Sequence, residues 1–385
     1  MTIEGVQAHA GRAPVSSHLG RIRAAMKRMT QCAVLVGIGI LIALAGVHYS
    51  MLPPVLQVPA SAETETFPIS GDMVDDPSLW VDPNDPEQSL VIASVKRFGL
   101  VVYDLNGRLV QSLVDGDINN VDIRQDVFLS GEPMTLIAAS RRDTNSIEFY
   151  TIDAASHRVV KLAQTDLITH NEIYGICLHH DRKTDYISVF VTGHTGVVEQ
   201  WMIFQGRSGL ISGHKVRKIK LHTVAEGCVA DDELGRLYLS EENHGIVWFH
   251  TDPTRGARKH WVDRIVTGVL RQDVEGLTLY KTGRETGYLL ASSQGNSTIV
   301  MYDRMDNHLL GRFHVSENPA ANVDEVTDTD GIVAVSSSLG RRYPSGLLVV
   351  QDGEDDVPRN RQNFKFVSFL DIIRALDPRQ GGRAG

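Results

Sequence analysis

Cysteine is scarce in this sequence, with three residues in 385. Cys32 lies in an apolar N-terminal run, and Cys177 and Cys228 each follow closely on a residue that opens one of the chain's six repeats. Two cysteines do not make the disulfide framework that holds small secreted domains together. We expect both to be small buried strand residues, and the alternative is a single bridge between neighbouring repeats.

Other signatures are missing as well. The sequence contains no serine nucleophile elbow, no P-loop and no HExxH helix. Helical periodicity is limited to FVSFLDIIRALDP near the C-terminus, which predicts one short helix after the last strand. Five of the 38 basic and one of the 47 acidic residues fall in the first 62, which leaves 33 against 46 and a net charge of −13. Such a surface repels nucleic acid, so we expect a monomer without a nucleic-acid partner.

The N-terminal region has the composition of a secretory signal. The basic residues Arg21, Arg23, Lys27 and Arg28 precede an apolar run from about Ala33 to Val47, and the small-residue pattern ASA ends at Ala62. This order predicts a signal peptide over residues 1–62, cleaved after Ala62. The apolar run approaches the length that spans a bilayer, so an uncleaved membrane anchor is the alternative. With cleavage we expect a secreted or periplasmic protein, and without it a protein that the N-terminal segment anchors to the membrane.

Six stretches of the chain share one pattern. Each opens with an acidic or hydrogen-bonding residue beside a small or turn residue and continues as strand, turn and strand. The stretches open at Asp76, Asp122, Tyr174, Glu226, Glu275 and Asp330. This period of about fifty residues is within the range of β-propeller blades. We therefore predict an all-β fold: a six-bladed β-propeller with a central channel over residues 63–378, and a disordered tail over 379–385. Residues 64–70 are apolar enough to be a strand, and pairing of this strand with the last repeat would close the propeller and place Glu63 beside that repeat.

Equivalent positions of propeller blades meet around the channel, so the six opening residues should form one ring at one mouth. A second polar position follows about twenty residues after each opening residue. These second positions are Lys96–Arg97, Arg141–Arg142, His194, Glu241–Glu242, Gln294 and Asp352. Repeats one to three thus supply cations or donors, and repeats four to six supply carboxylates. Further carboxylates nearby in sequence are Glu63, Asp75, Asp273, Asp324 and Asp328.

So many carboxylates in one mouth can ionise together only if cations neutralise them. The set lacks cysteine and has little histidine, which argues against zinc and copper. An all-oxygen set suits several Ca²⁺ ions, which take six to eight oxygen ligands, better than Mg²⁺. Beside Lys96, Arg97 and Arg142, such ions would form a positive half-ring suited to phosphate. The residues therefore predict metal-assisted phosphoester hydrolysis.

At these residues the sequence resembles the β-propeller phytases, the alkaline calcium-dependent 3-phytases of bacteria. The resemblance covers about Ala62 to Asp377 and includes, in family order, DDPSLWVDP, NNVDIR, AEGCVADDELGRLYLSEE, DVEGLTLY, YLLASSQGNS and QDGE. It implies a six-bladed propeller that removes phosphate stepwise from myo-inositol hexakisphosphate (phytate). It also implies a need for Ca²⁺ in stability and catalysis, with a Ca²⁺-bridging water as the nucleophile.

The resemblance also implies roles for individual residues. The calcium-site positions are Glu63, Asp75, Asp76, Glu226, Glu242, Asp273, Glu275, Gln294, Asp324 and Asp330. The phosphate-contacting positions are Lys96, Arg97, Arg142 and Tyr174. Of all these residues, we expect the catalytic ones to be Glu226, Asp324, Asp76, Lys96, Arg142 and Tyr174.

Two positions depart from the family pattern. His194 replaces a phosphate-binding lysine, so the charge there is partial and titrates near neutral pH. Arg141 replaces an asparagine, and it offsets the loss if its side chain turns inward. The alternative to a phytase is a calcium-stabilised propeller that binds phosphorylated ligands or a partner protein without turnover. A third hypothesis is a phosphoesterase for another small molecule. The complete set of carboxylates favours the phytase.

Overall fold

The computed structural model describes residues 26–31, 33–34, 52–129, 131–153, 155–354 and 361–376. The chain divides into two compact units, Met1–Leu52 and Pro53–Gly385. In the first unit, residues 26–31 and 33–34 are helical and exposed. Among the described residues, no helix combines the length and the apolar character needed to cross a bilayer. Most of the predicted signal segment and the predicted tail at 379–385 lie outside the described residues.

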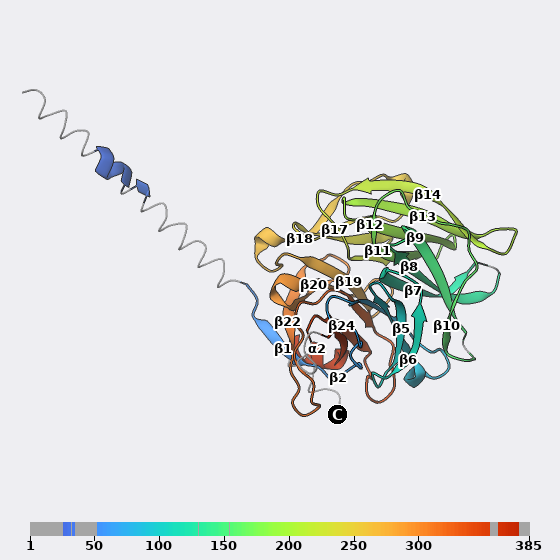
Figure 1. The fold of residues 1–385 in the computed structure, drawn as a ribbon. Coiled ribbons are helices and arrows are strands. Elements are labelled where there is room, and N and C mark those ends of the chain that lie inside the picture. The colour runs from blue at the N-terminus through green and yellow to red at the C-terminus, as the bar shows by residue number, and fades with distance from the viewer. Residues whose placement is uncertain are drawn as a thin grey trace, which may run out of the picture. The chain divides into compact units, whose positions relative to one another are not determined.

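The second unit is a six-bladed β-propeller, as predicted (Figure 1). Blades 1 and 2 contain β3 (Val74–Trp80), β4 (Leu90–Val95), β5 (Gly99–Asp104), β6 (Leu109–Val114), β7 (Ile118–Phe128), β8 (Pro133–Arg141), β9 (Ser146–Asp153) and β10 (Arg158–Lys161). Blades 3 and 4 contain β11 (Ile173–Asp181), β12 (Tyr186–Gly193), β13 (Val197–Gln205), β14 (Ile211–Lys220), β15 (Cys228–Asp231), β16 (Arg236–Glu241), β17 (Gly245–His250) and β18 (His260–Arg264).

Blades 5 and 6 contain β19 (Val274–Lys281), β20 (Gly287–Ser293), β21 (Thr298–Asp303), β22 (Leu309–Ser316), β23 (Ile332–Val335), β24 (Leu347–Asp352) and β25 (Asn363–Ser368). The predicted C-terminal helix is α2 (Phe369–Leu376). Four short 3₁₀ helices lie in the described connections: η1 (Pro86–Gln88), η2 (Pro253–Arg255), η3 (Ile265–Thr267) and η4 (Gln294–Asn296).

The hydrophobic core lies between neighbouring blades. Trp80 and Ile92 of blade 1, for example, share one buried cluster with Ile137 and Tyr150 of blade 2. A second strand such as β4 is therefore covered on both faces, and all six of its residues are buried. This explains why the second strands read as continuous apolar runs rather than as alternating patterns.

The ring is closed by the N-terminal part of the propeller. β2 (Ala62–Glu63) is the outermost strand of blade 6, whose other three strands come from the C-terminal end of the chain. It pairs antiparallel with β25, and Glu63 lies opposite Lys365. Glu63 lies beside the last blade, as predicted, but residues 64–70 are not the closing strand, because the pairing with β25 is made by Ala62 and Glu63.

The propeller begins earlier than predicted. β1 (Val55–Pro59) adds a fifth strand to blade 5 and pairs in parallel with β22, beside which Figure 1 shows it. Val58 and Ala60 are buried in the fold. The compact unit accordingly starts at Pro53, before the predicted boundary at Glu63. Cleavage after Ala62 stays a prediction, and it would remove β1 and half of β2.

The two cysteines of the propeller are joined. Cys177 of β11 and Cys228 of β15 form a disulfide between blades 3 and 4, with a Cα–Cα distance of 5.8 Å. The expectation of two unpaired cysteines was wrong, and the alternative bridge between neighbouring repeats is correct. The first strands of adjacent blades run side by side near the channel, which brings the two residues together.

We predict that β1 stabilises the propeller. Val58→Asp places a charge in a buried position and should lower the free energy of unfolding by about 3 kcal/mol or more. Gln57→Asp, at the exposed neighbouring position, should change it by less than about 0.5 kcal/mol. Urea unfolding measures both variants. A chain that begins at Glu63 and is as stable as one that begins at Pro53 would contradict this role of β1.

Candidate active site

The first strands of the blades carry an irregularity at the same level. In β3, β7, β11 and β19 the pairing with the second strand shifts by a bulge. Bulges re-aim side chains and are common beside active sites. The register places six residues at equivalent positions, which we call the ring residues: Asp75, Asn119, Tyr174, Glu226, Glu275 and Asp330.

Two of the predicted ring positions were wrong. In blades 3 to 6 the ring residue precedes a glycine, as in Tyr174–Gly175, whereas in blades 1 and 2 it precedes Asp76 and Asn120. Asp76 is therefore the neighbour of a ring residue, and its carboxylate accepts a hydrogen bond from the Val121 N–H at 3.2 Å. The glycine pattern was present in the sequence, but two blades lack it.

Asp122 lies further along β7 and does not reach the mouth. Its carboxylate forms an ion pair of 3.0 Å with Arg124 and accepts from the Leu178 N–H at 2.8 Å. Arg124 also donates to the Ala230 carbonyl and to Asp232, at 3.0 Å each. Asp122 therefore belongs to a buried network between blades 2, 3 and 4.

The glycines allow neighbouring blades to approach closely at the ring. A Cβ atom on Gly175 would lie 1.9 Å from the Glu226 carbonyl oxygen, and one on Gly227 would lie 2.0 Å from the Glu275 carbonyl oxygen. Any larger residue would push these blades apart. Close packing of the backbones therefore sets the distance between successive ring residues.

The second polar positions also form one set. The equivalent residues are Lys96, Arg142, His194, Glu242, Gln294 and Gly353. Because side chains alternate along a strand, the other residue of each pair, such as Arg97 or Arg141, points elsewhere. Arg141 pairs with Asp143 at 2.8 Å and with Asp115 at 3.3 Å. An inward turn of Arg141 as the offset for His194 was wrong, since these two carboxylates hold its guanidinium.

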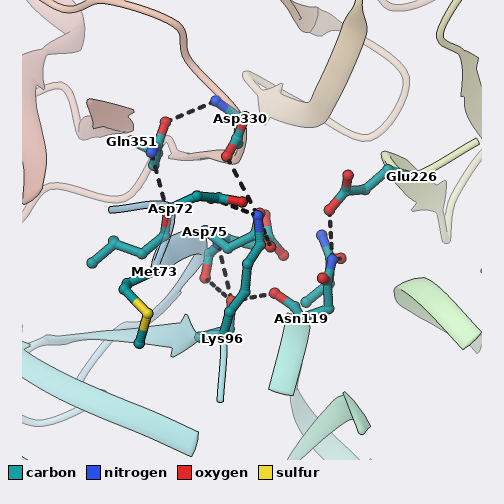
Figure 2. A network of polar contacts seen from close by, with 12 residues as sticks. Asp72, Met73, Asp75, Lys96, Asn119, Glu226, Asp330 and Gln351 are labelled. Carbon is teal, nitrogen blue, oxygen red and sulfur yellow. Dashed lines mark hydrogen bonds and ion pairs between the residues drawn. The ribbon is translucent and has the colours of Figure 1, made fainter. Parts of the chain in front are cut away.

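Lys96 is the cation at the centre of the blade 1 side of the site. Figure 2 shows its ammonium between three carboxylates, with Nζ to carboxylate oxygen distances of 2.9 Å to Asp72, 3.3 Å to Asp75 and 3.9 Å to Asp330. Burial disfavours the charged ammonium, but Asp75, Asp330 and Glu226 outweigh burial and raise the pKa of Lys96. Lys96 is therefore a permanent cation. Arg97 is exposed, and its guanidinium lies 2.8 Å from the Met73 sulfur, so the structure does not bring it into this group.

A chain of contacts links Arg142 of blade 2 and His194 of blade 3 to the Glu226 carboxylate of blade 4. Arg142 donates to the Asn119 side-chain oxygen at 3.1 Å, and the Asn119 amide donates to Glu226 at 2.6 Å. Figure 2 shows Asn119 and Glu226 facing each other. Arg142 also lies over the Tyr174 ring, 5.7 Å from its centroid, and His194 stacks on the same ring at 4.0 Å. Asn119 was not predicted as a site residue, although it lies in the segment NNVDIR.

Three carboxylates of blades 4 and 5 converge. Oxygen atoms of Glu226, Glu242 and Glu275 lie within 4.8 Å of one another. Burial and the charge of Asp330 raise the pKa of Glu226 to about 7, and burial and Asp273 raise the pKa of Glu242 to about 7. Glu275 has a buried oxygen, Oε2, without a hydrogen-bond partner in the described part of the chain. These groups fit a bound cation, which would supply the missing charge and the missing partner.

Other predicted ligands join this group or lie apart from it. Gln294 donates a hydrogen bond to Asp330, and the charge of Asp273 contributes to the raised pKa of Glu242. Glu63 and Asp324 instead contact the buried ammonium of Lys365, which lies 2.6 Å from Glu63 and 3.1 Å from Asp352. The predicted carboxylates thus divide into a mouth group and a group around Lys365 between blade 6 and the closing strand.

The mouth is hollow enough for a small ligand. A pocket of about 490 Å³ is lined by Gly71, Asp72, Lys96, Tyr174, Glu226, Glu275, Gln294, Asp328, Asp330, Gly353, Glu354 and Gln362. Below it the first strands leave a cavity of about 50 Å³ along the channel. The pocket is lined by one cation, Lys96, by hydrogen-bond donors and by carboxylates, which suits a charged ligand rather than an apolar one.

The sequence matches the family described as Phytase over residues 27–381. It is also 41% identical to a 3-phytase of Bacillus subtilis (strain 168) over 326 residues, which cover 82% of this chain and 85% of the relative. The chain belongs to the phytase family.

Solved structures outside the family give more distant likenesses. A luciferin-regenerating enzyme is 11% identical, with a TM-score of 0.49, over 77% of this chain and 92% of that one. A chain of a mitotic checkpoint complex is 9% identical, with a TM-score of 0.45, over 77% and 76%. Nothing further rests on these two.

The raised pKa values predict how stability depends on pH when divalent cations are removed. A carboxyl whose pKa is near 7 when folded and about 4.5 when unfolded costs stability as the pH rises from 4.5 to 7. In EDTA, the free energy of unfolding should therefore fall over this range, by on the order of 2 kcal/mol from Glu226 alone. Urea unfolding between pH 5 and 8 measures the fall.

The variant Glu226→Gln has no carboxyl at this position and should flatten this pH dependence, whereas Glu132→Gln, at an exposed position, should leave it unchanged. A divalent cation should restore more stability at pH 8 than at pH 5, because it binds the ionised carboxylates. If the free energy of unfolding falls equally in the wild-type protein and in Glu226→Gln, the pH dependence does not come from the Glu226 carboxyl.

Proposed function

We propose that this protein is a calcium-dependent 3-phytase, a phosphoric monoester hydrolase that acts on phytate. The observation that carries the proposal is that one asparagine connects two groups of residues, which we call the half-sites: a cationic half-site and a carboxylate half-site. Arg142 and Tyr174 lie on one side, the three converging glutamates lie on the other, and Asn119 contacts both Arg142 and Glu226. Membership of the phytase family supports the same substrate.

The cationic side binds the phosphate. Lys96 keeps its charge because three carboxylates surround its ammonium, and Arg142 offers a planar guanidinium that can donate two hydrogen bonds to one phosphate group. Asn119 fixes one nitrogen of Arg142 and leaves the others for the substrate. Burial and Glu226 raise the pKa of Tyr174, so its hydroxyl stays protonated and can donate.

The carboxylate side holds the cation. Glu226, Glu242 and Glu275 would be its direct ligands, with Asp75, Asp76, Asp273, Gln294 and Asp330 around them. Calcium is the cation that we favour, because the set is all oxygen and mostly carboxylate. When bound, Ca²⁺ supplies a water of lowered pKa for attack on phosphorus and neutralises charge on the phosphoryl oxygens. In such a hydrolysis the water oxygen would bond to phosphorus as the bond from phosphorus to the ester oxygen breaks, and a proton from the water would pass to the leaving oxygen, giving the inositol hydroxyl and phosphate.

The group around Lys365 has a different proposed role. Glu63 and Asp324 were predicted as calcium ligands, and Asp324 as a catalytic residue. Both contact Lys365, on the strand next to the closing strand. We propose that Asp324 stabilises the closure of the ring through its contact with Lys365. Its loss should then lower the stability of the protein more than it lowers turnover.

The setting of the protein follows from its surface and its disulfide. We propose that it is secreted or periplasmic, since a disulfide such as Cys177–Cys228 persists in oxidising compartments. We further propose a monomer that does not bind nucleic acid, in keeping with the net charge of −13 on residues 63–385.

The first test of this function is phosphate release from phytate. The wild-type protein should release phosphate with Ca²⁺ and lose this activity in excess EDTA. Glu226→Gln should reduce kcat by about a hundredfold or more, because it removes one ligand charge from the cation site. Asp306→Asn, on the surface, should keep wild-type kcat. Wild-type turnover in EDTA would overturn the calcium mechanism, and a complete lack of turnover with calcium would overturn the enzyme.

A second test concerns His194. Burial lowers the pKa of His194, so its imidazole is uncharged at neutral pH and above. His194→Lys should place a full charge beside Tyr174 and lower KM for phytate at pH 8, by tenfold or about 1 kcal/mol at most. The change should be smaller at pH 5.5, where the imidazole carries more charge. Arg141→Ala should leave KM unchanged, because Asp115 and Asp143 hold Arg141 away. An unaltered KM for His194→Lys at pH 8 would show that residue 194 does not reach the phosphate.

A further inference from the structure

Each second strand has a polar residue two positions before its position at the mouth, and in blades 1 to 5 this residue is a serine or threonine. These residues are Ser94, Ser140, Thr192, Ser240, Ser292 and Gln351. All six are buried. They lie on strands that are otherwise apolar, where a hydroxyl costs free energy unless it is hydrogen-bonded. Their recurrence at one level, next to the ring residues, calls for a physical reason.

In blades 1 to 3 the hydroxyl makes the same two contacts. The Ser140 oxygen accepts from the Asn120 N–H at 2.9 Å and donates to the Tyr174 carbonyl of the next blade at 2.6 Å. The Thr192 oxygen accepts from the Gly175 N–H at 2.9 Å and donates to the Glu226 carbonyl of the next blade at 3.2 Å.

Ser94 completes the set. It accepts from the Asp76 N–H at 3.0 Å and donates to the Asn119 carbonyl of blade 2. We call Ser94, Ser140 and Thr192 the hydroxyl clasps. Each clasp joins the bulge of its own blade to the ring residue of the next.

The later blades differ. Ser240 donates within its own blade, to the Gly227 carbonyl at 3.0 Å. Ser292 donates to Thr329, one residue before the ring residue, at 2.6 Å. Gln351 uses its amide to reach the Val74 carbonyl at 3.2 Å. The identical clasps are therefore confined to the junctions that deliver Asn119, Tyr174 and Glu226.

Those three ring residues are the ones that join the two half-sites. Glu226 accepts a hydrogen bond from Asn119 at 2.6 Å and another from the Tyr174 hydroxyl. Each of the three residues comes from a different blade. Their mutual distances depend on how three separate sheets are spaced. A direct hydrogen bond from one sheet to the backbone of the next ring residue fixes that spacing at the level of the site.

We infer that Ser94, Ser140 and Thr192 are positioning residues of the active site, which hold Asn119, Tyr174 and Glu226 at the spacing needed for turnover. This inference rests on the proposed function, because it assumes that these three ring residues act in catalysis. It predicts that loss of the Thr192 clasp lowers kcat rather than substrate affinity, since Thr192 holds Glu226 and contacts neither Lys96 nor Arg142. A small misplacement of reacting groups is enough to slow an enzyme strongly.

The test compares two buried threonines. Thr192→Val keeps the shape and removes the hydroxyl. Thr278→Val is the matched control, because Thr278 is also buried and accepts a hydrogen bond from the next blade, from the Ala334 N–H at 2.9 Å, but does not contact a ring residue. Both variants should lose several degrees of melting temperature. Only Thr192→Val should lose kcat for phytate, roughly tenfold, with KM nearly unchanged.

Two more variants and a second readout complete the experiment. Thr192→Ser keeps the oxygen and should restore kcat to within about twofold. Ser140→Ala, a smaller change, should repeat the loss of kcat even if Thr192→Val does not fold. The Ca²⁺ concentration that gives half of the thermal stabilisation should rise in Thr192→Val and stay constant in Thr278→Val.

The inference and the proposed function fail in different ways. Wild-type kcat in both Thr192→Val and Ser140→Ala, while Glu226→Gln is inactive, would overturn the clasps alone. Equal losses of kcat in Thr192→Val and Thr278→Val would also overturn them, because the loss would then follow stability. Full turnover by Glu226→Gln would overturn the proposed site and the clasps with it.

Discussion

The close approach of neighbouring blades at the mouth of the channel is the constraint on which the site depends. The ring residues come from six separate sheets, so no single strand determines their distances. Glycine at positions such as 175 and 227 lets one backbone lie against the carbonyl of the next ring residue. Charges that repel one another can then be held together, since the backbone packing that places them does not depend on their side chains.

The carboxylates of the propeller serve two different purposes. At the mouth, Glu226, Glu242 and Glu275 converge without an internal cation among them and keep raised pKa values. Around Lys365, three carboxylates converge on an ammonium that the chain itself supplies. The first arrangement is suited to an exchangeable ion, and the second to a permanent join. Sequence spacing does not separate the two, because both sets follow or precede strands in the same way.

Much of the fold could be predicted from the sequence because a propeller repeats. The blade count and the C-terminal helix follow from periodicity, and so do most residues of the mouth. The ring register was harder. The repeat pattern reads Asp76 in line with Glu226, whereas the bulge places Asp75 there and leaves Asn119 in the place expected for Asp122. Which residue of a polar pair faces the mouth, as for Arg141 and Arg142, depends on strand alternation and on local carboxylates. Pairing of Cys177 with Cys228 needs the spatial proximity of two strands that lie 51 residues apart.

The closing strand sets the order in which this protein can become complete. Glu63 and its partner Lys365 are 302 residues apart, so a strand that is made early in synthesis finds its place only when the last blade has been made. Contacts between such distant parts of a chain form slowly, because a long loop must close before any contact rewards it. Until then blade 6 has an open edge, and its ring residue Asp330 stands on an unfinished sheet. The active site therefore matures with the whole chain, and shorter partial products of synthesis cannot hold it.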